Sequence, residues 1–91
     1  MSSVSDNTQL NRYELDVDGH LSFIDYRRHG SVVTMMHAAV PPALNGRGIG
    51  SALAQGALDL VRQRKETVVP QCPFINSFIK RHAAYQNLLA V

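Results

Sequence analysis

The sequence is poor in cysteine, proline, aromatic residues and net charge. Its 91 residues include one cysteine, four prolines, three tyrosines, three phenylalanines and no tryptophan. A single cysteine excludes an internal disulfide framework. Lysine and arginine outnumber aspartate and glutamate by only 9 to 7, a net charge of +2. So small an excess argues against a nucleic acid as partner.

Long apolar runs are missing as well. No segment approaches the roughly 18 apolar residues that a membrane-spanning helix needs. The start, MSSVSDNTQLN, lacks the basic residues and apolar centre of a signal peptide. We therefore expect a cytoplasmic protein that has no membrane partner. Residues 1–11 are expected to form a disordered tail, and residues 12–91 a single domain.

What the chain does contain is enough apolar surface for a small core. Hydrophobic residues make up 45% of the sequence, which is ordinary for a globular protein. A domain of this length buries only roughly 60–65% of the surface that its unfolded chain exposes. A bound ligand or a second subunit in a homodimer would add stability to so thin a core.

Three strands are predicted ahead of the glycine-rich region. Residues 12–17 alternate between apolar and polar side chains, and Asp18-Gly19 then supplies a hairpin turn. Residues 20–28 form the second strand. Residues 32–40 form the third, which is nearly all apolar and is therefore expected to be central and covered on both faces. The three strands together predict an antiparallel meander.

A helix, a fourth strand and further helices follow. One apolar stripe at helical spacing consists of Ile49, Ala52, Leu53, Gly56, Ala57, Leu60 and Val61. Residues 67–72 are strand-like, and Pro70 within them indicates an edge or a point where pairing ends. Pro73 suits the first turn of a second helix, and residues 83–89 predict a short last helix. The fold class is therefore α/β (α+β): a mixed sheet in which the meander is followed by a βαβ crossover and C-terminal helices.

Three glycines stand at the strand-to-helix junction, at positions 46, 48 and 50. The first N–H groups of a helix have no partner within the helix, and with the helix dipole they form an anion site that suits phosphates. The alternative is a tight turn that needs glycine only for its geometry. The number of glycines and the nearby cation of Arg47 favour the phosphate site.

Two common nucleotide motifs do not fit. A P-loop requires Lys followed by Ser or Thr after its last glycine, and Ser51-Ala52 does not provide this pair. A dinucleotide fingerprint requires G-x-G-x-x-G, but Ser51 or Leu53 falls at its last position. The remaining chain is also too short for a doubly wound sheet.

The hexapeptide Asn45-Gly46-Arg47-Gly48-Ile49-Gly50 resembles the Q/R-x-x-G-x-G/A signature of the GNAT superfamily of acetyltransferases. The likeness extends over residues 37–85, which resemble a small single-domain GNAT-like family in the motifs H-x-x-V-P, C-P-F and R-H-x-x-Y. The departures are Asn45 for Gln or Arg, Ala38 for Thr, Ala39 for a common acidic residue, and Ala83 for Pro.

This resemblance implies the GNAT-like form of the fold and coenzyme A as the ligand of the loop. Backbone amides of the loop would hold the pyrophosphate, and the strand before it would pair with the pantetheine arm. The expected coenzyme-binding residues are Ala38, Ala39, Val40, Asn45, Gly46, Arg47, Gly48, Ile49, Gly50 and Ser51. No metal is expected.

Cys72 and His37 are the expected catalytic residues. Cys72 precedes a helix, where free amides and the dipole favour a thiolate, although a lone cysteine is usually a small core residue. The family's C-P-F cysteine falls on Cys72 and supports a catalytic role. Side-chain alternation places His37 with Met35 and Ala39 on one face of its strand, and it could serve as a base or be coupled to Cys72.

The resemblance implies an acetyl-coenzyme A-dependent N-acetyltransferase whose acceptor is an unidentified amine of a protein, peptide or small molecule. Direct transfer in a ternary complex is the expected mechanism. The alternative mechanism acetylates the Cys72 thiolate first. A second alternative is a coenzyme A-binding module or regulatory protein without efficient transfer, because Thr34 and Ala39 provide no carboxylate base.

Overall fold

The computed structural model describes residues 3–90, which form one mixed sheet and a set of helices. The strands are β1 (Ser5–Asn7), β2 (Arg12–Val17), β3 (His20–His29), β4 (Val32–Ala39) and β5 (Thr67–Pro70). The helices are α1 (Ile49–Gln63) and α2 (Pro73–Arg81), with shorter 3-10 helices η1 (Pro42–Leu44) and η2 (Ala83–Leu88). Every strand and helix expected between residues 12 and 89 is present.

The sheet has the strand order β1-β2-β3-β4-β5, and its first four strands are antiparallel. Helix α1 then carries the chain back so that β5 pairs with β4 in parallel. The predicted fold class, a meander followed by a βαβ crossover and C-terminal helices, is confirmed. No helix within residues 3–90 is both long and apolar enough to cross a membrane.

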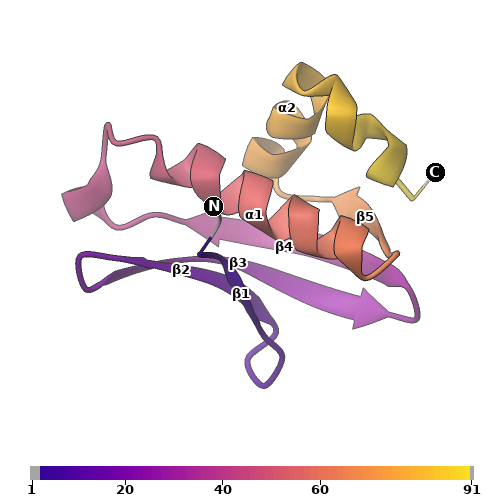
Figure 1. Ribbon diagram of the computed structural model, residues 1–91, viewed down its shortest axis with the longest axis horizontal. Helices are drawn as coiled ribbons and strands as arrows, with labels where there is room; N and C mark the ends of the chain where they lie inside the picture. Colours follow the sequence, from indigo (N-terminus) through magenta and orange to yellow (C-terminus); the bar gives the residue numbers. More distant parts are fainter. Residues whose placement is uncertain (1–2, 91) are drawn as a thin grey trace.

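Both α-helices lie on one face of the sheet (Figure 1). Helix α1 buries the predicted stripe against the strands, with two exceptions: Ala52 is exposed and Leu60 is half-buried. Ala54 and Leu58 are buried in addition, because α2 and η2 also pack against α1. The core therefore lies between one face of the sheet and the helices.

The expectation of a disordered tail over residues 1–11 is wrong for the part that the structure describes. Ser5–Asn7 pair with β2 as an edge strand. The side chain of Asp6 is 8% exposed and receives hydrogen bonds from Tyr26, Arg28 and Arg64. These contacts come from residues far along the chain, so they anchor a segment whose own composition looks disordered. Residues 1–2 of that tail and residue 91 of the expected domain lie outside the described residues.

The expectation that the third strand is covered on both faces is also wrong. In β4, Val33 and Met35 are buried under the helices, whereas Met36 and His37 are exposed. A bulge lies here, because Asp25 pairs with His37 and the next residue of β3 pairs with Met35, which leaves Met36 as an extra residue. The bulge reverses the alternation beyond it, so Ala38, and not His37, shares the helix-covered face with Met35.

Candidate functional site

The glycine loop meets α1 in the conformation that its composition predicts. Gly46 and Gly48 have φ angles of 77° and 71°, in the left-handed region that side chains other than glycine avoid. Gly48 is the N-cap residue of α1 and provides no side chain to cap it. A Cβ at either position would have no other atom within 4 Å, so open space surrounds the loop.

The backbone amides of the loop are available to a ligand. Among the hydrogen bonds of residues 3–90, none is donated by the N–H groups of residues 46–51, and the first backbone bond of α1 runs from Ala52 N–H to the Gly48 carbonyl at 3.1 Å. Six unpaired amides at the positive end of a helix dipole favour an anion. The structure thus has the kind of N-terminal site that binds phosphate groups.

The third glycine serves a different purpose. Gly50 lies inside the first turn of α1, and a Cβ there would stand 3.1 Å from Cζ of Phe74. The aromatic ring therefore packs directly against the helix backbone, and any side chain at this position would have to shift the ring. The three glycines are explained by two left-handed turns and one close approach.

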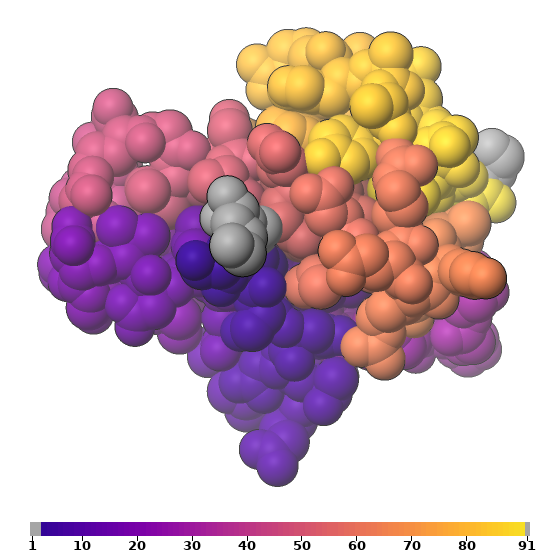
Figure 2. Space-filling view, viewed as in Figure 1, coloured from indigo at the N-terminus to yellow at the C-terminus, as the bar shows by residue number. Residues whose placement is uncertain are grey.

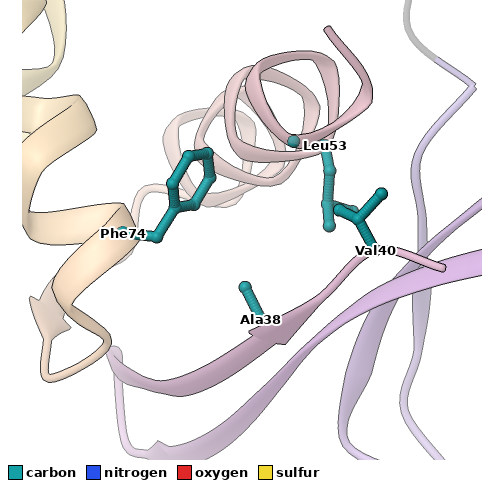
Figure 3. Close-up of a pocket in the computed structure, with 5 residues that line it drawn as sticks. Ala38, Val40, Leu53 and Phe74 are labelled. Atoms are coloured by element: carbon teal, nitrogen blue, oxygen red, sulfur yellow. The ribbon is translucent and has the colours of Figure 1, made fainter. Parts of the chain in front are cut away.

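An apolar cavity of about 270 Å³ opens beside the loop (Figure 3). Its lining residues come from β4 and the segment after it, from α1 and from α2: Ala38, Val40, Gly50, Leu53 and Phe74. In Figure 3, the ring of Phe74 stands on one side, Leu53 and Val40 on the other, and Ala38 lies between them on the strand. Of the three strand residues expected to bind coenzyme, Ala38 and Val40 line the cavity, whereas Ala39 pairs with Phe23 and lies on the other face.

Strands β4 and β5 separate next to this cavity. Their pairing ends at Met35 and Pro70, whereas β4 continues to Ala39, so the last part of β4 has an edge that β5 does not pair. The N–H group of Cys72 donates a 2.9 Å hydrogen bond to the Met35 carbonyl as the final contact. Pro70, which has no N–H to donate, therefore stands where pairing ends, as predicted.

The two expected catalytic residues lie on opposite faces of the sheet. Cys72 is the N-cap residue of α2, is 5% exposed and belongs to the core. His37 is exposed, and its cross-strand partner is Asp25. Its ring lies edge-on to the ring of Phe23, with 6.5 Å between the two ring centroids. The bulge at Met36 turns His37 away from the helices. The expected coupling of His37 to Cys72 therefore has no contact to support it.

Among the other loop side chains, those of Asn45, Arg47 and Ser51 are exposed, whereas that of Ile49 is buried in the core. Asn45 ends η1, and its N–H group bonds to the Pro42 carbonyl at 3.1 Å. Arg47 extends to the β2–β3 turn, where its guanidinium lies 2.9 Å from the Asp18 carboxylate. Figure 2 shows this end of the molecule, with the loop in pink above the purple turn. The cation of Arg47, a residue of the loop, is thus paired with an exposed carboxylate.

Tyr85, at the C-terminal end of the family-like region, has a structural contact. Its hydroxyl donates a 2.8 Å hydrogen bond to Asp59, which joins η2 to the middle of α1. Burial, and then this hydrogen bond, raise the pKa of Tyr85 to about 12. Tyr85 does not line the cavity. Within the described part of the chain, no group of three or more metal-ligating side chains occurs.

Sequence reasoning missed Phe74 as a site residue. The helical spacing of Phe74, Ile75, Phe78 and Ile79 predicts one buried apolar stripe on α2, and the last three of these residues are buried. Phe74 instead keeps 37% of its surface exposed at the edge of the cavity. The available signal was that Phe74 stands outermost in that stripe, in the first turn after Cys72.

Comparisons with known proteins agree with this geometry. Residues 12–88 match a family model described as GCN5-related N-acetyl-transferase. Protein NATD1 of Bos taurus is 37% identical over 57 residues, which cover 63% of this chain and 50% of that protein. The chain thus spans about half the length of this curated relative. The solution structure of a GCN5-like protein from Staphylococcus aureus has a TM-score of 0.72 at 20% identity, over 96% of this chain and 86% of that one.

Proposed function

The chain belongs to the GCN5-related N-acetyltransferase family, and from this premise we propose that it transfers an acetyl group from acetyl-coenzyme A to an amine. The observation that carries the proposal is the set of six unpaired backbone amides at residues 46–51, beside an apolar cavity. A ligand that joins a pyrophosphate to a largely apolar arm matches both parts. Coenzyme A has this composition.

The residues present fit such a ligand. The amides of residues 46–51 would bind the pyrophosphate, helped by the α1 dipole and by Arg47. The arm would lie between Ala38, Val40 and Leu53, against the edge of β4 that β5 leaves unpaired. When bound, acetyl-coenzyme A supplies an acetyl group already activated as a thioester.

Direct transfer to the amine remains the preferred mechanism. Cys72 is 5% exposed, and a side chain so enclosed is poorly placed to attack a thioester and then release its acetyl group to an acceptor. It does lie where β4 and β5 separate, so its proposed role is to position the reacting groups. The chain then contributes orientation and backbone N–H groups for the developing oxyanion.

His37 has a different proposed role, as the base for the acceptor amine. It lies on the outer face of the sheet, which the described helices leave uncovered. An acceptor amine that approaches the separated strands from this face would meet His37, whose imidazole could take the proton that the amine loses. The open face suits an amine on a protein or peptide. Membership of the smaller group defined by the C-P-F motif is part of the same proposal.

A coenzyme A-binding module without efficient transfer is the second candidate. One observation favours it: all five residues that line the cavity are apolar, and Thr34 and Ala39 provide no carboxylate. Such a protein would bind coenzyme A as tightly as an enzyme does but would have no base beside the thioester.

Two measurements on the full chain distinguish these functions. Calorimetric titration with coenzyme A tests the ligand, and release of free thiol from acetyl-coenzyme A, with and without a panel of amines and lysine peptides, tests transfer. The enzyme is supported by binding together with amine-dependent thiol release. Binding without turnover on any amine supports the module, and absence of binding contradicts both.

A further inference from the structure

Phe74 is the one large apolar side chain of α2 that remains substantially exposed. The next three apolar residues of the helix, Ile75, Phe78 and Ile79, are 0–2% exposed, against 37% for Phe74. Its ring does not lie in the core but against Gly50, at the edge of the cavity. Exposing an aromatic ring forgoes part of its hydrophobic stabilisation, so a role in ligand binding is worth testing.

The ring of Phe74 bounds the cavity on the α2 side. Figure 3 shows it facing Leu53 and Val40 across the cavity, with Ala38 between them. The backbone of α1 at Gly50, which also lines the cavity, lies close to the tip of the ring: a Cβ on Gly50 would stand only 3.1 Å from Cζ of Phe74. The ring therefore reaches from α2 to α1 and bounds the cavity between the two helices.

The ring stands close to where the acyl group would be. Phe74 follows Cys72 by two residues, and Cys72 makes the last contact between the two separating strands. An arm that begins at the loop and runs along β4 would bring its thioester to this region. Room for an acyl group there is bounded on the α2 side by the Phe74 ring.

We propose that Phe74 is a specificity-determining residue that restricts the coenzyme thioester to a short acyl group. The inference rests on the proposed function and deepens it. A bulky ring that reaches α1 leaves little room for added methylenes, and one methylene in a pocket commonly changes selectivity by about ten- to 200-fold. Removal of the ring by Phe74→Ala opens that side of the cavity.

The first experiment measures the affinity of the wild-type chain and of F74A for acetyl-coenzyme A and butyryl-coenzyme A by calorimetry. The wild type is expected to prefer the acetyl thioester by roughly tenfold or more, and F74A to reduce this preference to about threefold or less. Phe23→Ala is the matched control, because it removes a phenyl ring from the opposite face of the sheet and should keep the wild-type preference. An unchanged preference in F74A, or none in the wild type, overturns the inference.

The second experiment tests the contact with Gly50. Gly50→Ala places a methyl group against the ring and should displace the ring from its position at the cavity, which we expect to weaken acetyl-coenzyme A binding by about fivefold or more. In the double variant G50A/F74A the methyl group has no ring to displace, so affinity should return to that of F74A. If the loss of affinity persists in the double variant, the methyl group acts on the phosphate loop, and the proposed role of Phe74 is refuted.

The outcomes separate this inference from the function on which it rests. A wild-type chain that binds neither thioester nor coenzyme A overturns the proposed function and the inference together. A chain that binds coenzyme A with equal preference for both acyl groups keeps the function and overturns only the role of Phe74. Circular dichroism of each variant establishes that it is folded before titration.

Discussion

The N–H group of Cys72 donates a 2.9 Å hydrogen bond to the carbonyl of Met35, and beyond this bond β4 and β5 no longer pair. The bond fixes the start of α2 relative to the central strand, because Cys72 is the N-cap residue of that helix. It involves only backbone atoms, so the side chain of Cys72 can be changed without removing it.

Cys72→Ala should therefore separate catalysis from binding. We expect the variant to keep coenzyme A affinity within about twofold, to lose roughly tenfold or more in kcat of acetyl transfer, and to lose about 1 kcal/mol of stability from the buried thiol. Ile75→Val is a matched control, because it removes a similar volume from the same helix and should leave kcat unchanged. Full activity in C72A would make Cys72 a core residue only.

Gly48→Val should abolish the phosphate site. A β-branched side chain at φ 71° strains the backbone, at a cost of about 1–2 kcal/mol, and it covers amides that the phosphates must reach. Coenzyme A affinity measured by calorimetry should fall by more than tenfold. Gly30→Val imposes the same kind of strain at φ 60° in the β3–β4 turn and should not change affinity. Unaltered binding in G48V would show that the loop is not the phosphate site.

Asp18→Asn should strengthen coenzyme A binding. The side chains of Asp18 and Arg47 are 69% and 48% exposed, so their ion pair contributes at most about 1 kcal/mol to stability. Asparagine tolerates the positive φ of position 18, and the substitution frees the Arg47 guanidinium to pair with a phosphate. We expect the affinity for coenzyme A to rise by about two- to fivefold, and this rise to shrink at high salt. The gain should vanish in the double variant D18N/R47A. A gain that survives there would have to arise elsewhere than at Arg47.

The glycine loop was predictable because its chemistry is local. Gly46 and Gly48 adopt backbone angles that few other residues tolerate, and the helix after them follows from its apolar period. Pro70 likewise marks the end of pairing through its missing N–H group. In each case one residue type determines the local structure, so the sequence alone is sufficient.

The bulge at Met36 and the face of His37 were not predictable. The run from Val32 to Val40 is nearly all apolar and contains no polar marker of where alternation breaks, so the register depends on pairing with β3. The anchoring of Asp6 depends on Arg28 and Arg64, which lie far along the chain. Phe74 looked like a core residue because only the packing of α2 beside α1 decides what its ring meets.

Asp6→Ala should release the N-terminal strand. Asp6 accepts hydrogen bonds from Arg28, Arg64 and Tyr26 through a side chain that is only 8% exposed, and its removal leaves Arg28 with fewer partners. We expect a loss of about 2 kcal/mol in urea unfolding and faster hydrogen exchange in β1. Asp16→Asn, a charge removal at an exposed position, should change stability by less than about 0.5 kcal/mol. Wild-type exchange rates in D6A would mean that strand pairing alone holds β1.

Tyr85→Phe should reveal the hydrogen bond to Asp59 through its pH dependence. Burial and that bond raise the pKa of Tyr85 to about 12 in the folded protein, from 10.0 in the unfolded chain. The folded state therefore holds the proton more tightly, so this stabilisation is complete below pH 10 and is lost as the pH rises toward 12. In denaturant unfolding at pH 8, the variant should be about 1 kcal/mol less stable than the wild type. At pH 11 the difference should be smaller, because the wild type loses stability that the variant never had. A difference that stays constant between the two pH values would show that the phenolic proton contributes nothing to holding η2 on α1.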